Sequence, residues 1–153
     1  MKGEVLSFTS ELIYHKVLNN HLPKNIEGLF IELNLRNNKW LLFGGYNPKK
    51  ETISYFLDHI SKDLDKFIGS YDNLLLIGDF NSQMEEEKMN EFCDTYNLQN
   101  LINEPTCFKN VLSPTLIDMI LTNRVKGFHN SCCIETGISD YHKMTITILK
   151  TFF

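Results

Sequence analysis

Side chains that can bind a metal ion or a phosphate group follow several apolar segments of this sequence. The clearest case is Gly78-Asp79-Phe80-Asn81, which comes directly after the apolar run 74–77. Residues two apart on an extended segment point the same way, so Asp79 and Asn81 can both face one site. A carboxylate beside a carboxamide suits hydrated Mg²⁺ and a phosphate oxygen. The alternative is an ordinary strand end, where glycine and aspartate only form a turn.

Three other apolar segments also carry polar groups. These groups are Tyr46, Asp118 and the corner Ser139-Asp140-Tyr141-His142. A carboxylate among the apolar residues 116–121 has a heavy desolvation cost unless something pairs with it. His142 is the natural partner, because a buried carboxylate fixes the tautomer of an imidazole and raises its basicity. The alternatives are a tyrosine at the sheet rim, a surface-facing Asp118 on an edge strand and a structural histidine.

The periodicity of the chain predicts a mixed α/β scaffold for these residues. Residues 27–35 alternate as a strand does, and with residues 40–43 they predict an antiparallel hairpin. Residues 50–68 have the spacing of an amphipathic helix. The run 73–79 suits a strand covered on both faces. Shorter strands are predicted at residues 1–10, 106–109, 116–121, 131–136 and 144–148.

The acidic run Glu85-Glu86-Glu87 favours the start of a helix over a metal cluster. Ser82 followed by Glu85 fits a capping box, and acidic residues suit the positive end of a helix.

The composition is that of one soluble domain, covering residues 1–153. The net charge of −4 provides no overall basic field for nucleic acid, which counts against a tight, non-specific DNA binder. The four cysteines lack zinc spacing and are expected to be reduced thiols in an intracellular compartment. We see no signal peptide, and no apolar run approaches the ~20 residues of a membrane-spanning helix.

Three motifs in order resemble the endonuclease/exonuclease/phosphatase superfamily, which includes DNase I-like nucleases and inositol polyphosphate phosphatases. They are Gly78 to Asn81, Ser113 to Asp118 and Ser139 to His142, with Tyr46-Asn47-Pro48 upstream. The segments 118–123 and 136–144 are most similar to the endonuclease domain of non-LTR retrotransposons. The resemblance extends from about residue 27 to the end of the chain.

This resemblance implies a four-layer α/β sandwich, in which two mixed β-sheets pack face to face with helices outside. It also implies hydrolysis of DNA phosphodiesters with Mg²⁺ as cofactor and Mn²⁺ as a substitute. A reverse transcriptase domain in a longer polyprotein is the implied partner, and the nucleus is the implied compartment. No basic localisation run and no membrane partner are expected.

The resemblance also implies roles for individual residues. Asp79 would bind metal and activate the attacking water, and Asn81 would orient that water or bind the phosphate. His142 would contact a non-bridging phosphate oxygen, with Asp118 as its carboxylate partner. Tyr46 would contact the phosphate.

Asp140 would assist metal binding or departure of the leaving group. In many family members this acid and the histidine are adjacent, whereas here Tyr141 stands between Asp140 and His142. A bulge could absorb the extra residue.

A second departure concerns an asparagine and a metal-binding glutamate that the family carries well upstream of the Tyr-x-Pro segment. Glu4, Glu11 and Glu27 do not stand in a matching motif. We therefore expect an N-terminally incomplete domain that lacks its first strands and whose activity is weak or lost. One alternative is a non-catalytic remnant that acts by binding. Another is a phosphomonoesterase, which needs a basic pocket, and only Lys49-Lys50 offers such charge.

Overall fold

The computed structural model describes residues 13–19, 21–35, 38–84, 86–137 and 142–150. Two β-sheets, two α-helices and two short 3₁₀ helices, η1 (Ile68–Ser70) and η2 (Val125–Gly127), make up the regular structure of these residues. The strand order is β1-β2-β3-β4-β6-β5 in the large sheet and β7-β8 in the small one. The large sheet contains β1 (Tyr14–Leu18), β2 (Glu27–Leu35), β3 (Asn38–Tyr46), β4 (Asn73–Asp79), β5 (Gln99–Asn100) and β6 (Asp118–Thr122). The small sheet contains β7 (Phe128–Ile134) and β8 (Met144–Leu149), and the helices are α1 (Ile53–Phe67) and α2 (Glu87–Thr95).

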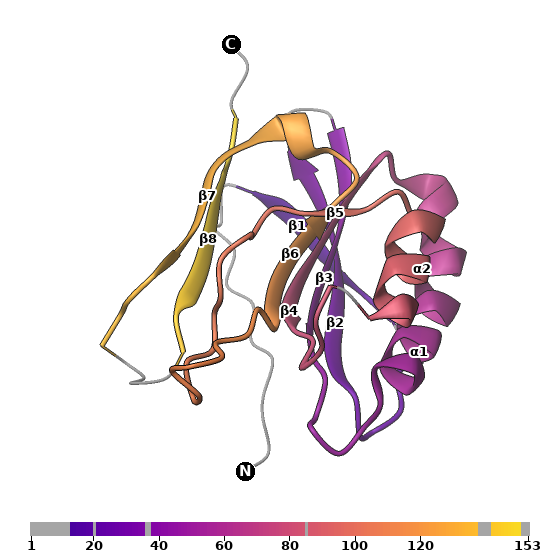
Figure 1. The fold of residues 1–153 in the computed structure, drawn as a ribbon. Helices are drawn as coiled ribbons and strands as arrows, with labels where there is room; N and C mark the ends of the chain where they lie inside the picture. The colour runs from indigo at the N-terminus through magenta and orange to yellow at the C-terminus, as the bar shows by residue number, and fades with distance from the viewer. Residues whose placement is uncertain (1–12, 20, 36–37, 85, 138–141, 151–153) are drawn as a thin grey trace.

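The elements are stacked in layers. Figure 1 shows α1 and α2 on one side of the large sheet and the β7–β8 hairpin on the other. This confirms the predicted α/β class with two sheets, of which the large one is mixed, because β3 and β4 run parallel while β2–β3 and β4–β6 run antiparallel. Within the described residues helices cover only the large sheet, so three of the four expected layers are present. No helix in these ranges is long and apolar enough to cross a membrane.

The central strand β4 is covered on both faces, as its continuous apolar run predicts. Leu74 and Leu76 belong to the core between the large sheet and the helices. Leu75 and Ile77 point the other way and line an apolar pocket of about 230 Å³ between the sheets, together with Phe128 from β7. This alternation sets the direction of the next residue in phase, Asp79, which points toward the small sheet.

Most of the predicted elements are confirmed. The hairpin is β2–β3, the amphipathic segment is α1, and segments 116–121, 131–136 and 144–148 overlap β6, β7 and β8. The predicted strand at 106–109 is reduced to isolated bridges from Cys107 to Thr115 and to His142. The predicted strand at 1–10 lies outside the described residues.

The predicted capping box is wrong. Helix α2 begins at Glu87, with Glu86 at its N-cap, so Ser82 lies before the helix. The side chain of Glu86 accepts a hydrogen bond from the backbone N–H of Gln83 at 3.3 Å, while Ser82 Oγ donates to Gln83 O at 3.4 Å. The residues after β4 are thus used in a turn that delays the helix start.

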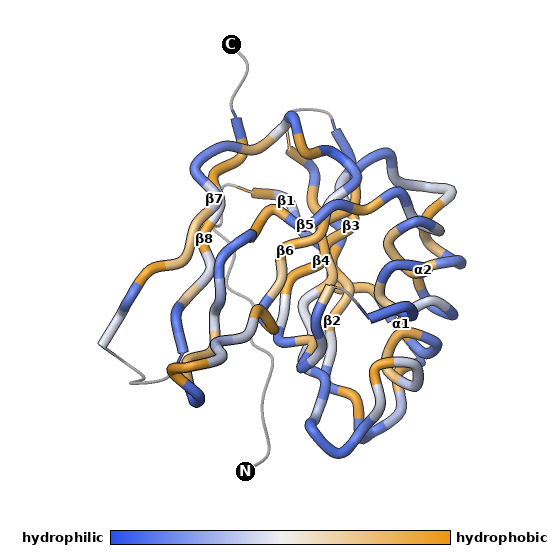
Figure 2. Tube along the Cα trace, viewed as in Figure 1, coloured by the Kyte–Doolittle hydropathy of each residue, from blue (hydrophilic) through white to orange (hydrophobic). Residues whose placement is uncertain are grey.

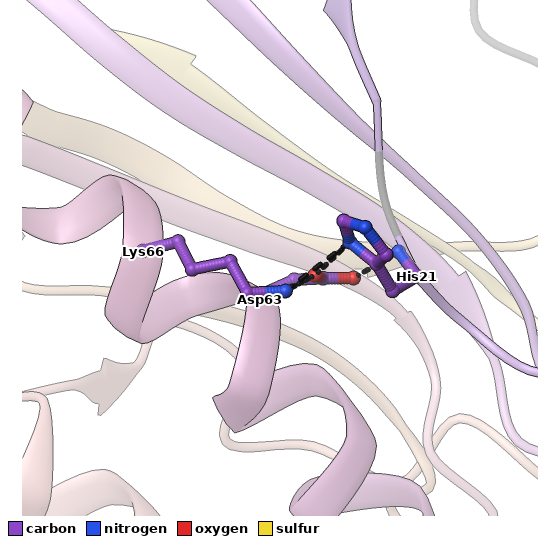
Figure 3. Close-up of polar contacts among 3 residues, drawn as sticks. All are labelled: His21, Asp63 and Lys66. Atoms are coloured by element: carbon purple, nitrogen blue, oxygen red, sulfur yellow. Dashed lines mark hydrogen bonds and ion pairs between the residues drawn. The ribbon is translucent and has the colours of Figure 1, made fainter.

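A buried carboxylate on α1 fixes the loop that leads into β2. Asp63 is 1% exposed and accepts hydrogen bonds from the backbone N–H of His21 at 2.6 Å and from Lys66 Nζ at 2.8 Å (Figure 3). His21 Nδ1 lies 3.2 Å from the same carboxylate. Burial alone would raise the pKa of Asp63, but the bonds from Lys66 and His21 outweigh it and leave this pKa lowered.

Candidate active site

Three of the predicted site residues lie in one row across the large sheet. In register, Tyr46 of β3 lies opposite Asp79 of β4, and Asp79 lies opposite Asp118 of β6. Residues in register on neighbouring strands project from the same face. The row therefore presents a phenol and two carboxylates toward the small sheet, at the C-terminal ends of β3 and β4.

A close contact between strands β3 and β4 brings this row together. Gly45 and Gly78 are in register one residue before Tyr46 and Asp79. A Cβ atom added to Gly78 would lie 1.9 Å from Gly45 O, so this position admits only glycine without a shift of the backbone. The glycine that the sequence places before Asp79 thus has a packing role.

The turn after β4 holds Asp79 and Asn81 in place. Asn81 adopts a positive φ of 47°, and its backbone N–H donates to Asp79 Oδ1 at 2.9 Å. Its side-chain Nδ2 donates to Asn47 O at 2.7 Å, and Asn47 N donates to Asp79 O at 2.8 Å. The strand ends at Asp79, so extended alternation does not decide where Asn81 points, and its side chain braces the loop after β3.

The two carboxylates of the row raise each other's energy when both are charged. The pKa of Asp79 is raised to about 6, first by burial and then by the charge of Asp118. The backbone N–H of Asn81 and the charges of Lys49 and Lys109 oppose this rise. Asp79 is therefore a carboxyl group whose pKa lies within reach of neutral pH.

Asp118 is also in an unfavourable place for a negative charge. Burial raises its pKa, while a hydrogen bond from Thr106 and the charge of His142 oppose the rise. Its Oδ2 is buried and makes no hydrogen bond within the described part of the chain. The interaction with His142 is thus electrostatic, and a direct Asp118–His142 hydrogen bond stays a prediction.

The segment Thr106-Cys107 connects Asp118 to His142. Thr106 is fully buried, and its Oγ1 accepts hydrogen bonds from the backbone N–H groups of Ile117 and Asp118 at 3.2 and 3.1 Å. The next residue, Cys107, pairs with His142 through a backbone bridge, and its Sγ lies 3.8 Å from His142 Nε2. His142 is thereby placed at the Asp118 end of the row.

The remaining predicted residue, Asp140, lies outside the described residues. Across residues 13–19, 21–35, 38–84, 86–137 and 142–150, no group of three or more His, Cys, Asp or Glu side chains could hold a metal ion. Asp79 and Asp118 are the acidic pair that the structure brings together. Their oxygen atoms, their mutual repulsion and the unsatisfied Asp118 Oδ2 fit a hard divalent cation.

Three residues near the site were not predicted from the sequence. Glu27 begins β2 opposite Tyr46, so it extends the polar row, and its Oε2 is buried without a hydrogen-bond partner in the described ranges. Thr106 and Cys107 are the other two. The sequence does contain a signal for the position of Glu27, namely the alternation of residues 27–35 together with the predicted hairpin, which places residue 27 at the end of a strand beside the strand that ends near Tyr46. The roles of Thr106 and Cys107 depend on contacts with residues 11 and 35 positions away.

Comparison with known proteins supports the fold. No protein-family model matches the sequence, and no curated protein matches it. Among solved structures, the endonuclease domain of TRAS1, described as a telomere-specific non-LTR retrotransposon, is similar with a TM-score of 0.67 and 15% identity. That match covers 90% of this chain and 67% of the TRAS1 domain.

Two other solved structures are similar at comparable identity. An endonuclease/exonuclease/phosphatase family protein from Leptotrichia buccalis matches with a TM-score of 0.61 and 14% identity, covering 94% of this chain and 73% of that one. The human Nocturnin catalytic domain, solved with a bound sulfate anion, matches with a TM-score of 0.55 and 16% identity, over 76% and 50% of the two chains. The chain therefore has the DNase I-like fold of this superfamily, and it spans half to about three quarters of these three structures.

Proposed function

We propose that this protein is a divalent-cation-dependent phosphodiesterase that cleaves DNA, of the endonuclease type found in non-LTR retrotransposons. The observation that carries the proposal is the row of Tyr46, Asp79 and Asp118, with His142 at its Asp118 end, on a DNase I-like fold. We include in the proposal a reverse transcriptase domain as partner and action in the nucleus. Both rest on the likeness to a retrotransposon endonuclease alone.

The proposed reaction is attack of water on a phosphodiester in line with the leaving oxygen. Asp79 accepts a hydrogen bond from the attacking water and takes up its proton. His142 donates a hydrogen bond to a non-bridging oxygen, and Tyr46 donates a second. The P–O bond to the leaving oxygen breaks, and that oxygen takes up a proton from solvent water, while Asp79 afterwards releases to the solvent the proton that it accepted.

Mg²⁺ or Mn²⁺, when bound, would supply a Lewis acid that offsets negative charge on the phosphate. Asp79 would hold the ion. Asp140 is the second proposed ligand and lies outside the described residues. Asn81 is proposed to orient the water, and its side-chain bond to Asn47 fixes the turn from which it would act.

Features around the row favour a nucleic-acid substrate over a small phosphate ester. Lys49 and Lys109 act electrostatically on Asp79, and Lys109 lies in the hairpin-like loop between Cys107 and Thr115. At the tip of this loop Val111 is 77% and Leu112 is 96% exposed. Cations beside an apolar tip suit contact with phosphates and with base edges or stacked bases.

The test is nicking of supercoiled plasmid DNA in the presence of Mg²⁺ by the wild-type protein and by Asp79→Ala and His142→Ala. We expect cleavage by the wild type only, with a loss of at least about 100-fold in each variant. Cleavage that persists in EDTA would remove the metal-dependent mechanism. No turnover on any phosphodiester would favour the non-catalytic alternative, in which the chain acts only by binding.

A second set of activity measurements distinguishes DNA cleavage from phosphomonoesterase activity. Leu112→Ser and Val111→Ser should weaken kcat/KM on DNA and leave hydrolysis of a small phosphodiester, bis(p-nitrophenyl) phosphate, unchanged. Turnover of inositol phosphates in preference to DNA would instead support the phosphomonoesterase alternative.

A further inference from the structure

We propose that Lys143 is a positioning residue that holds the loop between Cys107 and Thr115 beside the segment of His142. The consequence for DNA rests on the proposed function, because this loop is part of the proposed contact with nucleic acid. The position of the loop itself can be measured without any turnover.

The loop is closed at its base and is bonded locally beyond it. At the base, the N–H groups of Cys107 and Thr115 donate to each other's carbonyl oxygens, both at 2.9 Å. Further along, Leu112 N donates to Asn110 Oδ1 at 3.2 Å, and Ser113 N donates to Asn110 O at 3.1 Å. Bonds of this kind fix the shape of a loop, whereas its orientation depends on contacts with the residues around it.

Lys143 makes such a contact with the first residue of the loop. Figure 1 shows the loop beside the start of β8, and the Nζ of Lys143 lies 4.8 Å from the centroid of the Phe108 ring. A cation within about 6 Å of an aromatic centroid is attracted to the ring. The side chain of Lys143 is 25% exposed, so most of its stem is packed against the protein.

The other partner of the Lys143 ammonium is held weakly. Its Nζ lies 3.5 Å from Glu135 Oε1, but the side chain of Glu135 is 84% exposed. Ion pairs with so exposed a partner contribute little to stability. The contact with Phe108 is therefore the one that we expect to orient the loop.

The backbone of Lys143 connects this contact to the candidate site. Its N–H donates to Thr106 O at 2.9 Å, and Thr106 Oγ1 accepts a hydrogen bond from the N–H of Asp118 at 3.1 Å. Lys143 also directly follows His142 in the chain. Its side chain thus reaches from the segment of His142 to the loop.

The loop carries groups that favour a nucleic-acid substrate. The charge of Lys109 acts on Asp79, and the apolar tip of the loop is exposed. Phe108 directly precedes Lys109, so the ring that Lys143 contacts lies where the loop leaves its base. Without this contact the loop should sample more orientations, and ordering it on DNA would cost affinity. The chemical step should change little.

The first measurement is hydrogen exchange of residues 108–114 in the metal-free protein, followed by mass spectrometry. Lys143→Gln should speed exchange in this loop about two- to fivefold, as expected for loss of a partly exposed cation–π contact, and should leave α2 unchanged. Phe108→Leu should have the same effect, and the double variant should add little to either single change. Lys143→Arg keeps a cation over the ring and should exchange like the wild type.

Lys88→Gln is the matched control. Lys88 is also paired with a glutamate, at 2.6 Å from Glu91 Oε2 on α2, and its replacement changes the net charge equally. It should leave exchange of the loop unchanged. Thermal melting shows whether each variant folds, and only folded proteins are compared. Unchanged exchange in Lys143→Gln, or additive effects of Lys143→Gln and Phe108→Leu, would overturn the inference.

The second measurement is DNA cleavage with Mg²⁺. Lys143→Gln and Phe108→Leu should each raise KM for plasmid DNA about two- to fivefold with little change in kcat, and Lys143→Arg should restore KM. A direct contact of Lys143 with a DNA phosphate would instead raise KM in Lys143→Gln but not in Phe108→Leu, which keeps the charge. That result, or an equal rise of KM in Lys88→Gln, would refute the positioning role.

The two proposals can fail separately. If the wild type cleaves no phosphodiester, the proposed function fails, and hydrogen exchange alone decides the role of Lys143. If the wild type cleaves DNA while Lys143→Gln changes neither the exchange of the loop nor KM, the role of Lys143 is refuted and the proposed function stands.

Discussion

The ionised form of Asp79 lowers the stability of the folded protein. Its pKa is raised from 3.8 to about 6 because burial and the charge of Asp118 disfavour its ionised form. A group whose folded-state pKa is raised favours the folded protein while it is protonated. The free energy of unfolding should therefore fall as pH rises from about 4 to about 6 and stay lower above that.

Asp79→Asn removes this cost and should stabilise the metal-free protein at pH 7.5 while abolishing DNA cleavage. We expect a gain of about 1–2 kcal/mol in the free energy of unfolding, after allowance for the partial exposure of the group. Urea unfolding in EDTA at pH 4 and at pH 7.5 measures it, and the gain should nearly vanish at pH 4. Equal stability of the two proteins at pH 7.5 would contradict the proposed repulsion between Asp79 and Asp118.

A bound divalent cation should relieve the repulsion between Asp79 and Asp118. In thermal melts at pH 7.5, Mg²⁺ should raise the Tm of the wild type, because a ligand that binds only the folded state adds about 1.4 kcal/mol at ten times its Kd. Asp79→Asn should lose most of this response. Na⁺ at matched ionic strength serves as the control for screening. A shift of equal size in Asp79→Asn would place the cation elsewhere.

Strands β3 and β4 can bring Tyr46 and Asp79 together only because two glycines meet between them. A Cβ on Gly78 would lie 1.9 Å from Gly45 O. We expect Gly78→Ala to lower the free energy of unfolding by at least about 3 kcal/mol, or to prevent folding.

Gly69→Ala is the matched control, because an added Cβ there meets nothing within 4 Å. It should be neutral or stabilising by up to about 1 kcal/mol. Expression yield, circular dichroism and urea unfolding compare the two variants. A well-folded Gly78→Ala protein of wild-type stability would refute the close contact of the two strands.

Helix α1 fixes the β1–β2 connection through one buried carboxylate. Asp63→Ala removes the acceptor for His21 N and Lys66 Nζ and should cost about 2 kcal/mol at pH 7. Because the folded-state pKa of Asp63 is lowered, this stability is present above about pH 4 and is lost as pH falls through the folded pKa.

The difference between wild type and Asp63→Ala should therefore shrink on going from pH 7 to about pH 2.5, as measured by urea unfolding. Glu91→Gln provides the control, because its partner Lys88 is 53% exposed and exposed pairs contribute little. That change should leave the free energy of unfolding nearly unchanged. A constant difference at both pH values would mean that Asp63 acts through packing alone.

The parts of the fold that the sequence predicts are those fixed by local periodicity. The β2–β3 hairpin and α1 follow from alternation and from spacings of three and four over many residues. Strand β5 was not predicted, because its two residues form a strand only by pairing with β6. The predicted start of α2 is wrong by several residues, because Ser82 and Gln83 form part of the turn after Asn81 and not the first turn of the helix.

The candidate site shows the same division. The residue types and their order pointed to Tyr46, Asp79, Asp118 and His142, whose placement depends on strand ends. The in-register row itself depends on how β3, β4 and β6 pair, which no local pattern specifies. The Thr106-Cys107 segment was beyond prediction, because its relevance comes from tertiary contacts rather than from a motif.

The apolar surface of the protein is unevenly covered. Figure 2 shows apolar residues concentrated along the strands between the layers, while α1 and α2 carry polar residues as well. On β8, however, Met144, Ile146 and Ile148 are 48%, 39% and 45% exposed, in alternation with the threonines that point inward. An apolar stripe on a sheet face favours association between molecules.

We therefore expect the wild-type protein to associate reversibly as its concentration rises, and a charge on the stripe to prevent this. Ile146→Lys and Ile148→Lys should keep the fold, since both side chains already face solvent, and should shift the protein toward the monomer in light scattering coupled to size-exclusion chromatography. Val111→Lys adds the same charge to an exposed apolar residue away from β8, in the loop between Cys107 and Thr115, and should leave association unchanged. If Val111→Lys shifts the protein toward the monomer as much as the β8 variants do, net charge rather than the apolar stripe controls association. If the wild type is monomeric at every concentration, the exposed face of β8 does not cause association.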